Sequence, residues 1–232
     1  MLSIVIPCYN EEARLPRTIE QVEQYLEGND LSYELILVDD GSSDGTREVM
    51  NAAAGRNRSV RLEALPRNRG KGRALAEGVA VAKGSQVLVT DADLSTPIEE
   101  LPKLQAELDR GAGVAIASRA VKGSRVEISQ PFYRVLMGKA FNLLVQAVLL
   151  PGIWDTQCGF KLFRADVAHE AFAELTTDGF GYDPEVLYLA KKRGVKIAEV
   201  PVVWRNSAPT KVSPIKSSLD MFRHVLRIRF SG

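Results

Sequence analysis

Short apolar runs alternate with longer stretches of helical periodicity over the first half of the chain. The runs are nearly continuous, which is typical of strands that are buried on both faces of a parallel sheet. They lie at residues 2–6, 33–38, 60–65, 87–89 and 114–117. Helical stretches follow them, at about 15–26, up to 54, up to 82 and at about 99–110. This alternation predicts an α/β fold with a mostly parallel sheet and helices on both of its faces.

The pattern changes after residue 119. Residues 131–150 are apolar over most of their surface, although polar side chains interrupt them. Burial against the core is one interpretation, and a pair of helices in a membrane interface is the other. A helix up to residue 192 and a strand at 196–204 come next. The tail from 214, with a candidate interface helix at 215–230, is amphipathic and basic; a solvated helix face and contact with anionic lipid both explain it.

Composition narrows the class of protein. A chain of 232 residues with 45% hydrophobic content buries one substantial core. We therefore expect a single domain over 1–232. The net charge of +1 argues against a nucleic-acid partner.

The compartment is constrained by the cysteines and by the N-terminus. Cys8 and Cys158 are too few for a disulfide framework, which fits a reducing, cytosolic setting. The first residues lack the basic region and cleavage site of a signal peptide, so we interpret them as a strand. No apolar run reaches the roughly 18 to 20 residues of a membrane span. The sequence assigns no oligomeric state.

Polar clusters follow the strands, where ligands bind in sheets of this kind. The leading cluster is Asp91-Ala92-Asp93 after the run at 87–89. In extended backbone, residues i and i+2 point to the same side, so both carboxylates can face one point. Such a pair repels unless a cation lies between them, and Mg²⁺ or Mn²⁺ with substrate phosphates answers that need. The structural alternative is a solvated turn or a capping box at residues 96–99.

Two further clusters have both a structural and a functional interpretation. Residues 39–46 either cap a helix through Ser43 or Asp44 or contribute to a ligand site. Residues 67–72 combine glycines with basic side chains at a helix start, which suits an anion. The spacing of Gly70, Gly72 and Gly78 is not G-x-G-x-x-G, so a dinucleotide-binding fold is disfavoured.

Seven motifs then suggest a family. In order they are IVIPCYNEE, ILVDDGSSDGT, NRGKGRALAEG, VTDADLSTP, ASR, DTQCGFKLF and GFGYDPEVLYLA. Together they resemble the inverting family 2 glycosyltransferases of the GT-A fold, which is Rossmann-like, over nearly the whole chain. Within that family the likeness is to the branch that makes polyprenyl-phosphate sugars, the dolichyl-phosphate β-glucosyltransferases and their mannosyl relatives.

The resemblance implies a nucleotide-sugar donor, with UDP-glucose favoured over GDP-mannose, and a Mg²⁺ or Mn²⁺ ion on Asp91 and Asp93. It also implies a nucleotide-sugar-binding half at 1–119 and an acceptor-side half at 120–232. The implied donor-site residues include Asp91, Ala92 and Asp93. The other implied donor-site residues are Pro7, Tyr9, Glu11, Asp39, Asp40 and Lys71.

The acceptor chemistry can be argued from the residues. A lipid phosphate is already an anion near pH 7 and can attack the anomeric carbon without a general base, inverting it. It needs cationic positioning, for which arginine is well suited. The candidates are Arg119, Arg134 and Lys161, with Arg119 first; the structural alternative for any one of them is a surface ion pair. We therefore expect a metal-dependent hexosyltransferase, peripheral at the cytosolic membrane face, acting on a polyprenyl phosphate.

Two alternatives stay open. In relatives that glycosylate hydroxyls an acidic residue serves as base, and Asp183 or Glu185 could take that role on a small hydroxy acid or a polysaccharide. Asp183 followed by Pro184 is equally a good helix start. The remaining hypothesis is a nucleotide-sugar-binding module without catalysis, against which the intact Asp91, Asp93 and Arg119 speak.

Overall fold

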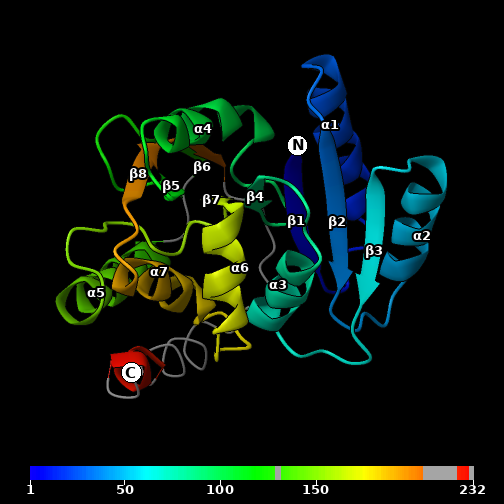
Figure 1. Ribbon diagram of the computed structural model, residues 1–232. Helices are drawn as coiled ribbons and strands as arrows, with labels where there is room; N and C mark the ends of the chain where they lie inside the picture. The colour runs from blue at the N-terminus through cyan, green and yellow to red at the C-terminus, as the bar shows by residue number, and fades with distance from the viewer. Residues whose placement is uncertain (129–131, 206–223, 230–232) are drawn as a thin grey trace.

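The computed structural model describes residues 1–128, 132–205 and 224–229, and of residues 132–134 only the backbone. The main sheet has seven strands in the order β3-β2-β1-β4-β7-β5-β8 (Figure 1). The strands are β1 (Leu2–Cys8), β2 (Tyr33–Asp39), β3 (Val60–Ala64), β4 (Gln86–Val89), β5 (Val114–Ser118), β7 (Lys161–Arg164) and β8 (Ile197–Pro201). Only β7 runs antiparallel to its neighbours β4 and β5. The predicted α/β fold with a mostly parallel sheet is confirmed.

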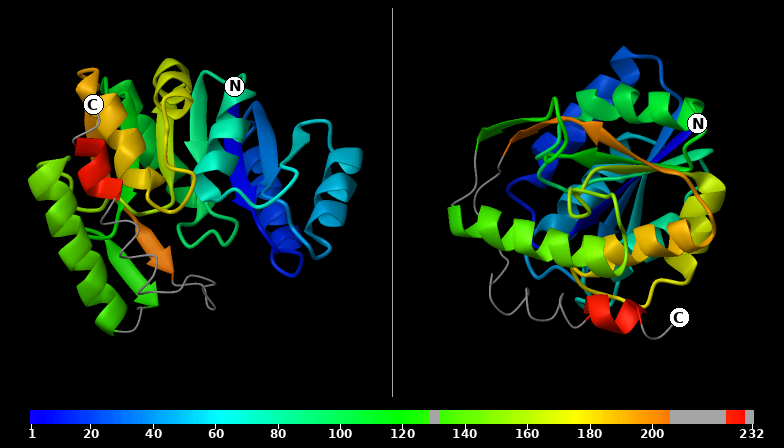
Figure 2. Two further views of the ribbon diagram at one scale, coloured as in Figure 1. Left: turned by 90° about the horizontal axis from the view of Figure 1, so that it is seen from below. Right: turned by 90° about the vertical axis from the view of Figure 1, so that its left-hand side faces the viewer.

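Helices cover both faces of this sheet (Figures 1 and 2). One face carries α1 (Leu15–Gly28), α2 (Thr46–Arg56), the short 3-10 turn η1 (Ile98–Glu100) and α4 (Leu101–Asp109). The other face carries α3 (Lys71–Ala80), α5 (Phe132–Val148), α6 (Ala165–Ala173) and α7 (Tyr182–Lys192).

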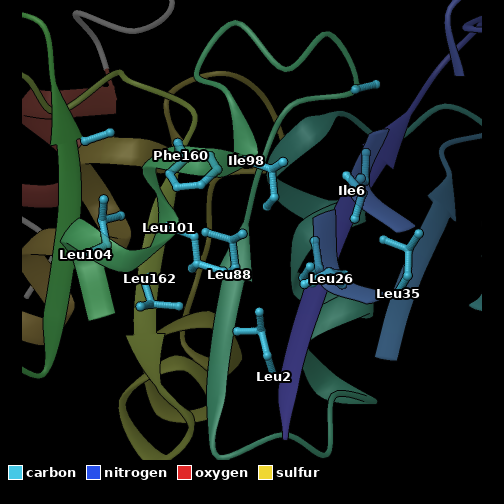
Figure 3. Packing of buried hydrophobic residues seen from close by; sticks show 14 of the residues in the cluster. Leu2, Ile6, Leu26, Leu35, Leu88, Ile98, Leu101, Leu104, Phe160 and Leu162 are labelled. Carbon is cyan, nitrogen blue, oxygen red and sulfur yellow. The ribbon is translucent and has the colours of Figure 1, made fainter. Parts of the chain in front are cut away.

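Each buried strand contributes alternate side chains to two separate cores. In β1, Ile4 and Ile6 pack with α1 and α4, whereas Val5 packs with α3 on the opposite face. Figure 3 shows the first of these cores, in which Leu88 and Leu162 lie beside Leu101. This two-sided burial explains why the strands read as continuous apolar runs in the sequence.

The second half departs from the expected elements in three places. Residues 131–150 had two interpretations, burial against the core and a pair of interfacial helices; their described part forms one helix, α5, with Val145 buried and Leu143 exposed. The strand expected at 196–204 is two strands, β8 and β9 (Val203–Arg205), because the chain leaves the main sheet after Pro201 and β9 pairs with β6 (Arg125–Ile128) in a small second sheet. Strand β7 and helix α6 are elements that the sequence pattern did not indicate.

The candidate helix at 215–230 falls largely outside the described residues. Residues 224–229 are helical, and Val225 is buried against the core that contains α7. Within the described ranges, none of the helices has the length and hydrophobicity that crossing a bilayer requires.

Candidate active site

The polar clusters meet at the carboxyl end of the parallel strands. Strand β1 is hydrogen-bonded to β2 on one side and to β4 on the other, with Cys8 opposite Asp39 and Val5 opposite Val89. The loops that follow these strands therefore leave the sheet at one edge, which is where ligands bind in folds of this kind. The residues after β5, beginning with Arg119, leave from the same end.

Asp91 and Asp93 lie in a tight turn after β4. The N–H of Leu94 donates to the Asp91 carbonyl at 3.1 Å, and Leu94 has a positive φ of 44°. Asp93 accepts a hydrogen bond from the Ser95 N–H at 2.9 Å. Burial and the neighbouring charge of Asp91 raise the pKa of Asp93 above its usual range. The charge of Asp91 therefore acts on Asp93, although the two residues lie in a turn and not in the extended backbone that the sequence argument assumed.

This donor set fits a hard divalent cation. Two carboxylates supply oxygen ligands, and the repulsion between them is relieved by a positive charge. Within the described residues there is no cluster of three or more histidine, cysteine, aspartate or glutamate side chains arranged to hold a metal. A cation on Asp91 and Asp93 would therefore take its remaining ligands from substrate or water, as Mg²⁺ at phosphate sites does.

Gly159 leaves room for the Asp91 carboxylate. A Cβ atom at residue 159 would lie 2.0 Å from Oδ2 of Asp91 and 2.5 Å from its Cγ. Gly159 does not have a positive φ, so an alanine there is not strained by its backbone conformation.

We expect Gly159→Ala to lower the rate of the expected sugar transfer at least about tenfold with little loss of stability, because the new methyl group displaces the Asp91 carboxylate, a candidate metal ligand, and not a core side chain. Steady-state rates and thermal unfolding measure the two effects. Gly55→Ala is the matched control, since a Cβ at residue 55 meets nothing within 4 Å. Equal activity of the two variants would contradict this assignment.

Lys71 also contacts the Asp pair, from the first residue of α3. Its ammonium group forms an ion pair with Asp91 and lies 5.5 Å from the centre of the Tyr182 ring. Burial lowers the pKa of Lys71, but the carboxylates of Asp91, Asp183 and Asp93 outweigh it, so the pKa lies above its ordinary value. Lys71 is therefore a firmly cationic group at the Asp pair, where it can meet a diphosphate.

A second lysine lies near the same ring. Lys161 is fully buried, with its ammonium group 5.8 Å from the Tyr182 ring centre. It donates to the Cys158 carbonyl at 2.7 Å and forms an ion pair with Asp183. The candidate base on α7 is thus held by a buried cation.

Breaking the buried ion pair between Lys161 and Asp183 is expected to destabilise the folded protein. Asp183→Asn should lower the free energy of unfolding by about 3 kcal/mol, because it leaves the Lys161 ammonium unpaired in the interior. Lys161→Met/Asp183→Asn should recover most of the loss, since neither partner is then an isolated charge. Urea denaturation of the two variants tests this, and a single variant as stable as the double one would speak against it.

Glu185, the other candidate base, anchors a loop. Its carboxylate accepts hydrogen bonds from the N–H groups of Thr176 and Thr177 at 2.9 and 3.0 Å, and from the Thr176 hydroxyl at 2.7 Å. It is 4% exposed. These contacts account for both oxygens, so the arrangement shows a structural role for Glu185.

The residues expected at the donor lie along this same edge. Pro7 is near the end of β1, Tyr9 is exposed, and Glu11 forms an ion pair with Arg14 at 3.4 Å. Ala92 is buried, and its carbonyl accepts a hydrogen bond from the Thr18 hydroxyl at 2.6 Å.

Asp39 and Asp40 are both buried and bound within the chain. Asp39 accepts from the Ser42 N–H at 2.8 Å and from the Arg47 Nε at 2.8 Å. Asp40 accepts from the N–H groups of Arg69 and Gly70 at 2.7 and 2.8 Å. Asp40 therefore fixes the start of α3, where Lys71 is, and the donor contacts expected of both aspartates stay predictions.

Arg119, directly after β5, is held in a defined orientation. Its Nε and Nη2 donate to the two carboxylate oxygens of Asp155 at 2.7 and 2.9 Å. The guanidinium also lies 5.2 Å from the centre of the Trp204 ring. Burial raises the pKa of Asp155, but Arg119 outweighs it and the pKa lies below its usual range. The planar fork of arginine suits this bidentate contact and leaves its remaining N–H groups for an anion.

A cavity of about 760 Å³ opens beside Arg119, between α5 and the small β6–β9 sheet. Its lining is mostly apolar and includes Val126, Val135 and Leu143, with Trp154 and Trp204 near Arg119. Lys139 on α5 also contributes to the lining. The cavity therefore combines an apolar wall with cationic groups.

The three expected acceptor cations are placed differently. Arg119 lines this cavity. Lys161 is not among the lining residues, because its ammonium group is buried with Asp183. Arg134 belongs to α5 by its backbone, but its side chain lies outside the described residues, so its role remains a prediction.

Sequence reasoning missed the partners of these groups. Asp155, Trp154 and Trp204 line the cavity but were not among the candidates. The DTQCGFKLF motif was a signal for Asp155, which stands at its first position. No periodicity in the chain indicated that β9 would bring Trp204 beside Arg119.

Comparison with known proteins places these observations in a family. A family model described as glycosyl transferase family 2 matches residues 3–172. The dolichyl-phosphate beta-glucosyltransferase of Dictyostelium discoideum is 34% identical over 241 residues, covering 99% of this chain and 74% of that protein. The Homo sapiens protein of the same name is 36% identical over 241 residues, covering 98% of this chain and 74% of that protein.

Solved structures share the fold. Glucosyl-3-phosphoglycerate synthase from Mycobacterium tuberculosis, in complex with Mn²⁺, UDP-glucose and phosphoglyceric acid, superposes with a TM-score of 0.72 at 22% identity. The match covers all of this chain (100%) and 79% of that one. At this identity the likeness shows the GT-A fold.

Proposed function

The chain belongs to glycosyl transferase family 2 and is a hexosyltransferase, and on this premise we propose that it transfers glucose from UDP-glucose to a polyprenyl phosphate, with inversion and with a divalent metal ion. The observation that carries the proposal is the apolar cavity with the Arg119 guanidinium in its wall. The relatives named dolichyl-phosphate beta-glucosyltransferase, at 34% and 36% identity, support the same sugar and acceptor.

The donor would bind where the loops after β1, β2 and β4 meet. A divalent cation on Asp91 and Asp93 would neutralise the leaving diphosphate without a proton donor. Lys71 adds a permanent positive charge to the same place, through its contact with Asp91. The glycine at residue 159 leaves the space that the Asp91 carboxylate occupies.

The acceptor phosphate would be oriented by Arg119, whose guanidinium is fixed by Asp155 and Trp204. Because a phosphate oxygen already carries charge, the attack on the anomeric carbon requires no proton transfer to the protein. Polyprenyl units adjoining the phosphate would lie against the apolar wall of the cavity, where Val126 and Leu143 are 45% and 67% exposed. Burying such surface is favourable for an isoprenoid.

Exposed apolar side chains on α5 and beside the cavity support peripheral contact with a membrane. Leu136 and Leu143 on α5 are more than half exposed, and Trp154 next to the cavity is 56% exposed. A lipid substrate in a bilayer could enter the cavity past this apolar rim. We place the reaction at the cytosolic face, and the free, buried Cys8 and Cys158 are compatible with a reducing compartment.

The alternative acceptor is a hydroxyl group, which would need Asp183 or Glu185 as base. The buried ion pair of Asp183 with Lys161 and the loop contacts of Glu185 favour the phosphate acceptor over it. The Lys161→Met/Asp183→Asn variant separates the two without leaving a lone buried charge. A hydroxyl-acceptor enzyme should lose about 100-fold in rate, and a phosphate-acceptor enzyme much less.

Sugar transfer to lipid tests the proposal directly. Radiolabelled UDP-glucose and GDP-mannose are supplied in parallel with Mg²⁺ or Mn²⁺ and a short polyprenyl phosphate, followed by organic extraction. We expect label in the organic phase from UDP-glucose, and its disappearance with EDTA. Hydrolysis of the donors with no lipid product from either would overturn the proposal and favour a hydroxyl acceptor.

A further inference from the structure

The loop that carries Asp155 is held from two sides. From β8, the Glu199 carboxylate accepts hydrogen bonds from the N–H groups of Trp154 and Asp155 at 2.7 and 2.9 Å. From α5, the side-chain amide of Asn142 donates to the Trp154 carbonyl. Two backbone donors on one carboxylate fix the loop in both position and direction.

Glu199 is rigidly placed because β8 is hydrogen-bonded to β5. Its register partner in β5 is Ile116, three residues before Arg119. The paired strands β5 and β8 therefore support both residues. Arg119 follows β5 in the chain, and Glu199 on β8 holds Asp155. The Asp155 carboxylate then links the loop to Arg119, because it accepts hydrogen bonds from the backbone N–H of Arg119 at 2.9 Å and from two of its guanidinium nitrogens.

We propose that Glu199 is a positioning residue for acceptor recognition, which acts through Asp155 to hold the Arg119 guanidinium toward the cavity. The inference rests on the proposed function, because it assigns the role of Arg119 to an acceptor phosphate. A guanidinium held in advance loses less side-chain entropy when it binds an anion. Glu199 itself is not among the residues that line the cavity, so its effect on the acceptor is indirect.

The chain offers a direct probe of this region. It contains two tryptophans, Trp154 and Trp204, and both line the cavity. Intrinsic tryptophan fluorescence therefore reports on the acceptor side without turnover. Titration with a short isoprenyl monophosphate, such as geranyl phosphate, gives a dissociation constant that is independent of the donor and of the metal.

We expect Glu199→Ala to raise the dissociation constant of the isoprenyl monophosphate and the KM for polyprenyl phosphate by about tenfold. The KM for UDP-glucose should stay within about twofold. Glu199→Gln keeps one acceptor oxygen and should show an intermediate effect, about threefold. Such a graded split between the two substrates is not expected of a general loss of stability.

Glu34 provides the matched control. Its carboxylate also accepts from a backbone N–H, that of Lys83 at 2.5 Å, and from the Ser3 hydroxyl at 2.6 Å. It lies near the start of β2, at the opposite end of the strands from the candidate site. Glu34→Ala and Glu34→Gln should lower the melting temperature and leave both KM values unchanged.

The outcomes separate this inference from the proposed function. Wild-type binding and lipid transfer, combined with Glu199 variants of unchanged affinity for the monophosphate, would overturn the role of Glu199 alone. A parallel rise of both KM values would also overturn it. A wild-type protein that neither binds the monophosphate nor transfers sugar to lipid would overturn the proposed function and the role of Glu199 with it.

Discussion

Asp93→Ala is expected to lower the rate of sugar transfer by about 10,000-fold. The variant loses one of the two carboxylates that would hold the cation, and a catalytic metal contributes several kcal/mol to stabilising charge in the transition state. At 1.36 kcal/mol for each tenfold in rate, a loss of about 5 kcal/mol corresponds to that factor. EDTA should reduce the wild-type rate by a comparable amount, and added Mn²⁺ should restore it in the wild type only.

The same substitution should not weaken the fold. Burial and the charge of Asp91 raise the pKa of Asp93, so its ionised form is disfavoured in the folded protein. Removing it should leave the melting temperature unchanged or higher, which is typical of charge clusters kept for function at the expense of stability. Thermal unfolding and Mn²⁺ binding by calorimetry measure this separation.

Asp166→Ala is a suitable control for Asp93→Ala. Asp166 pairs with Arg164 at the surface, where both side chains are more than half exposed, so its loss should change neither rate nor stability much. An Asp93→Ala enzyme that retains a tenth or more of wild-type activity would contradict the assignment of Asp93 to the metal.

The main sheet could be predicted because its signal is local. Continuous apolar runs, such as residues 2–6, follow from burial on both faces, and the structure shows Ile4 and Val5 in different cores. The meeting of the clusters after β1, β2 and β4 follows from parallel pairing, which brings the strand ends to one edge. Asp91 and Asp93 do lie at this edge, but a turn after β4 brings them together and not the extended backbone from which their proximity was predicted.

The acceptor side could not be predicted in the same way, because its contacts join distant segments. Asp155 reaches Arg119 across 36 positions of the sequence, and Glu199 reaches Asp155 across 44. Strand β7 is four residues long and enters the sheet antiparallel, so no helix–strand alternation indicates it. Its insertion between β4 and β5 buries Lys161, which the sequence had offered as a ligand for the acceptor phosphate.

The proposed donor site and the apolar cavity also differ in how the sequence determines them. The donor side depends on turns of fixed sequence, as between Asp91 and Ser95, whereas the acceptor cavity depends on where α5 and β9 pack. The order of the motifs therefore predicted the donor side but gave almost no information about the cavity. Arg119 stands at the boundary, since its motif places it after β5 and only the packing places it in the cavity wall.

Arg119→Ala is expected to lower kcat/KM for the polyprenyl phosphate by about 1,000-fold, with donor binding unchanged. Truncating one partner of a buried, hydrogen-bonded charge pair at a binding site costs 2 to 5 kcal/mol or more, and about 4 kcal/mol corresponds to that factor. Arg119→Lys should fall between this variant and the wild type, because lysine keeps the charge but not the bidentate contact with Asp155. Varying the lipid and the donor separately in steady-state assays gives both values.

Arg119→Ala also leaves the Asp155 carboxylate buried without its partner, and a loss of folding could imitate a loss of function. Arg119→Ala/Asp155→Asn removes that charge and should recover stability but not lipid affinity. Arg205→Ala is the matched control, since Arg205 lies next to Trp204 and pairs at 2.7 Å with Glu127, where both side chains are about half exposed. If the double variant regained the wild-type KM for polyprenyl phosphate, the acceptor phosphate would have to bind elsewhere, and Lys139 in the same cavity wall would be the next residue to replace.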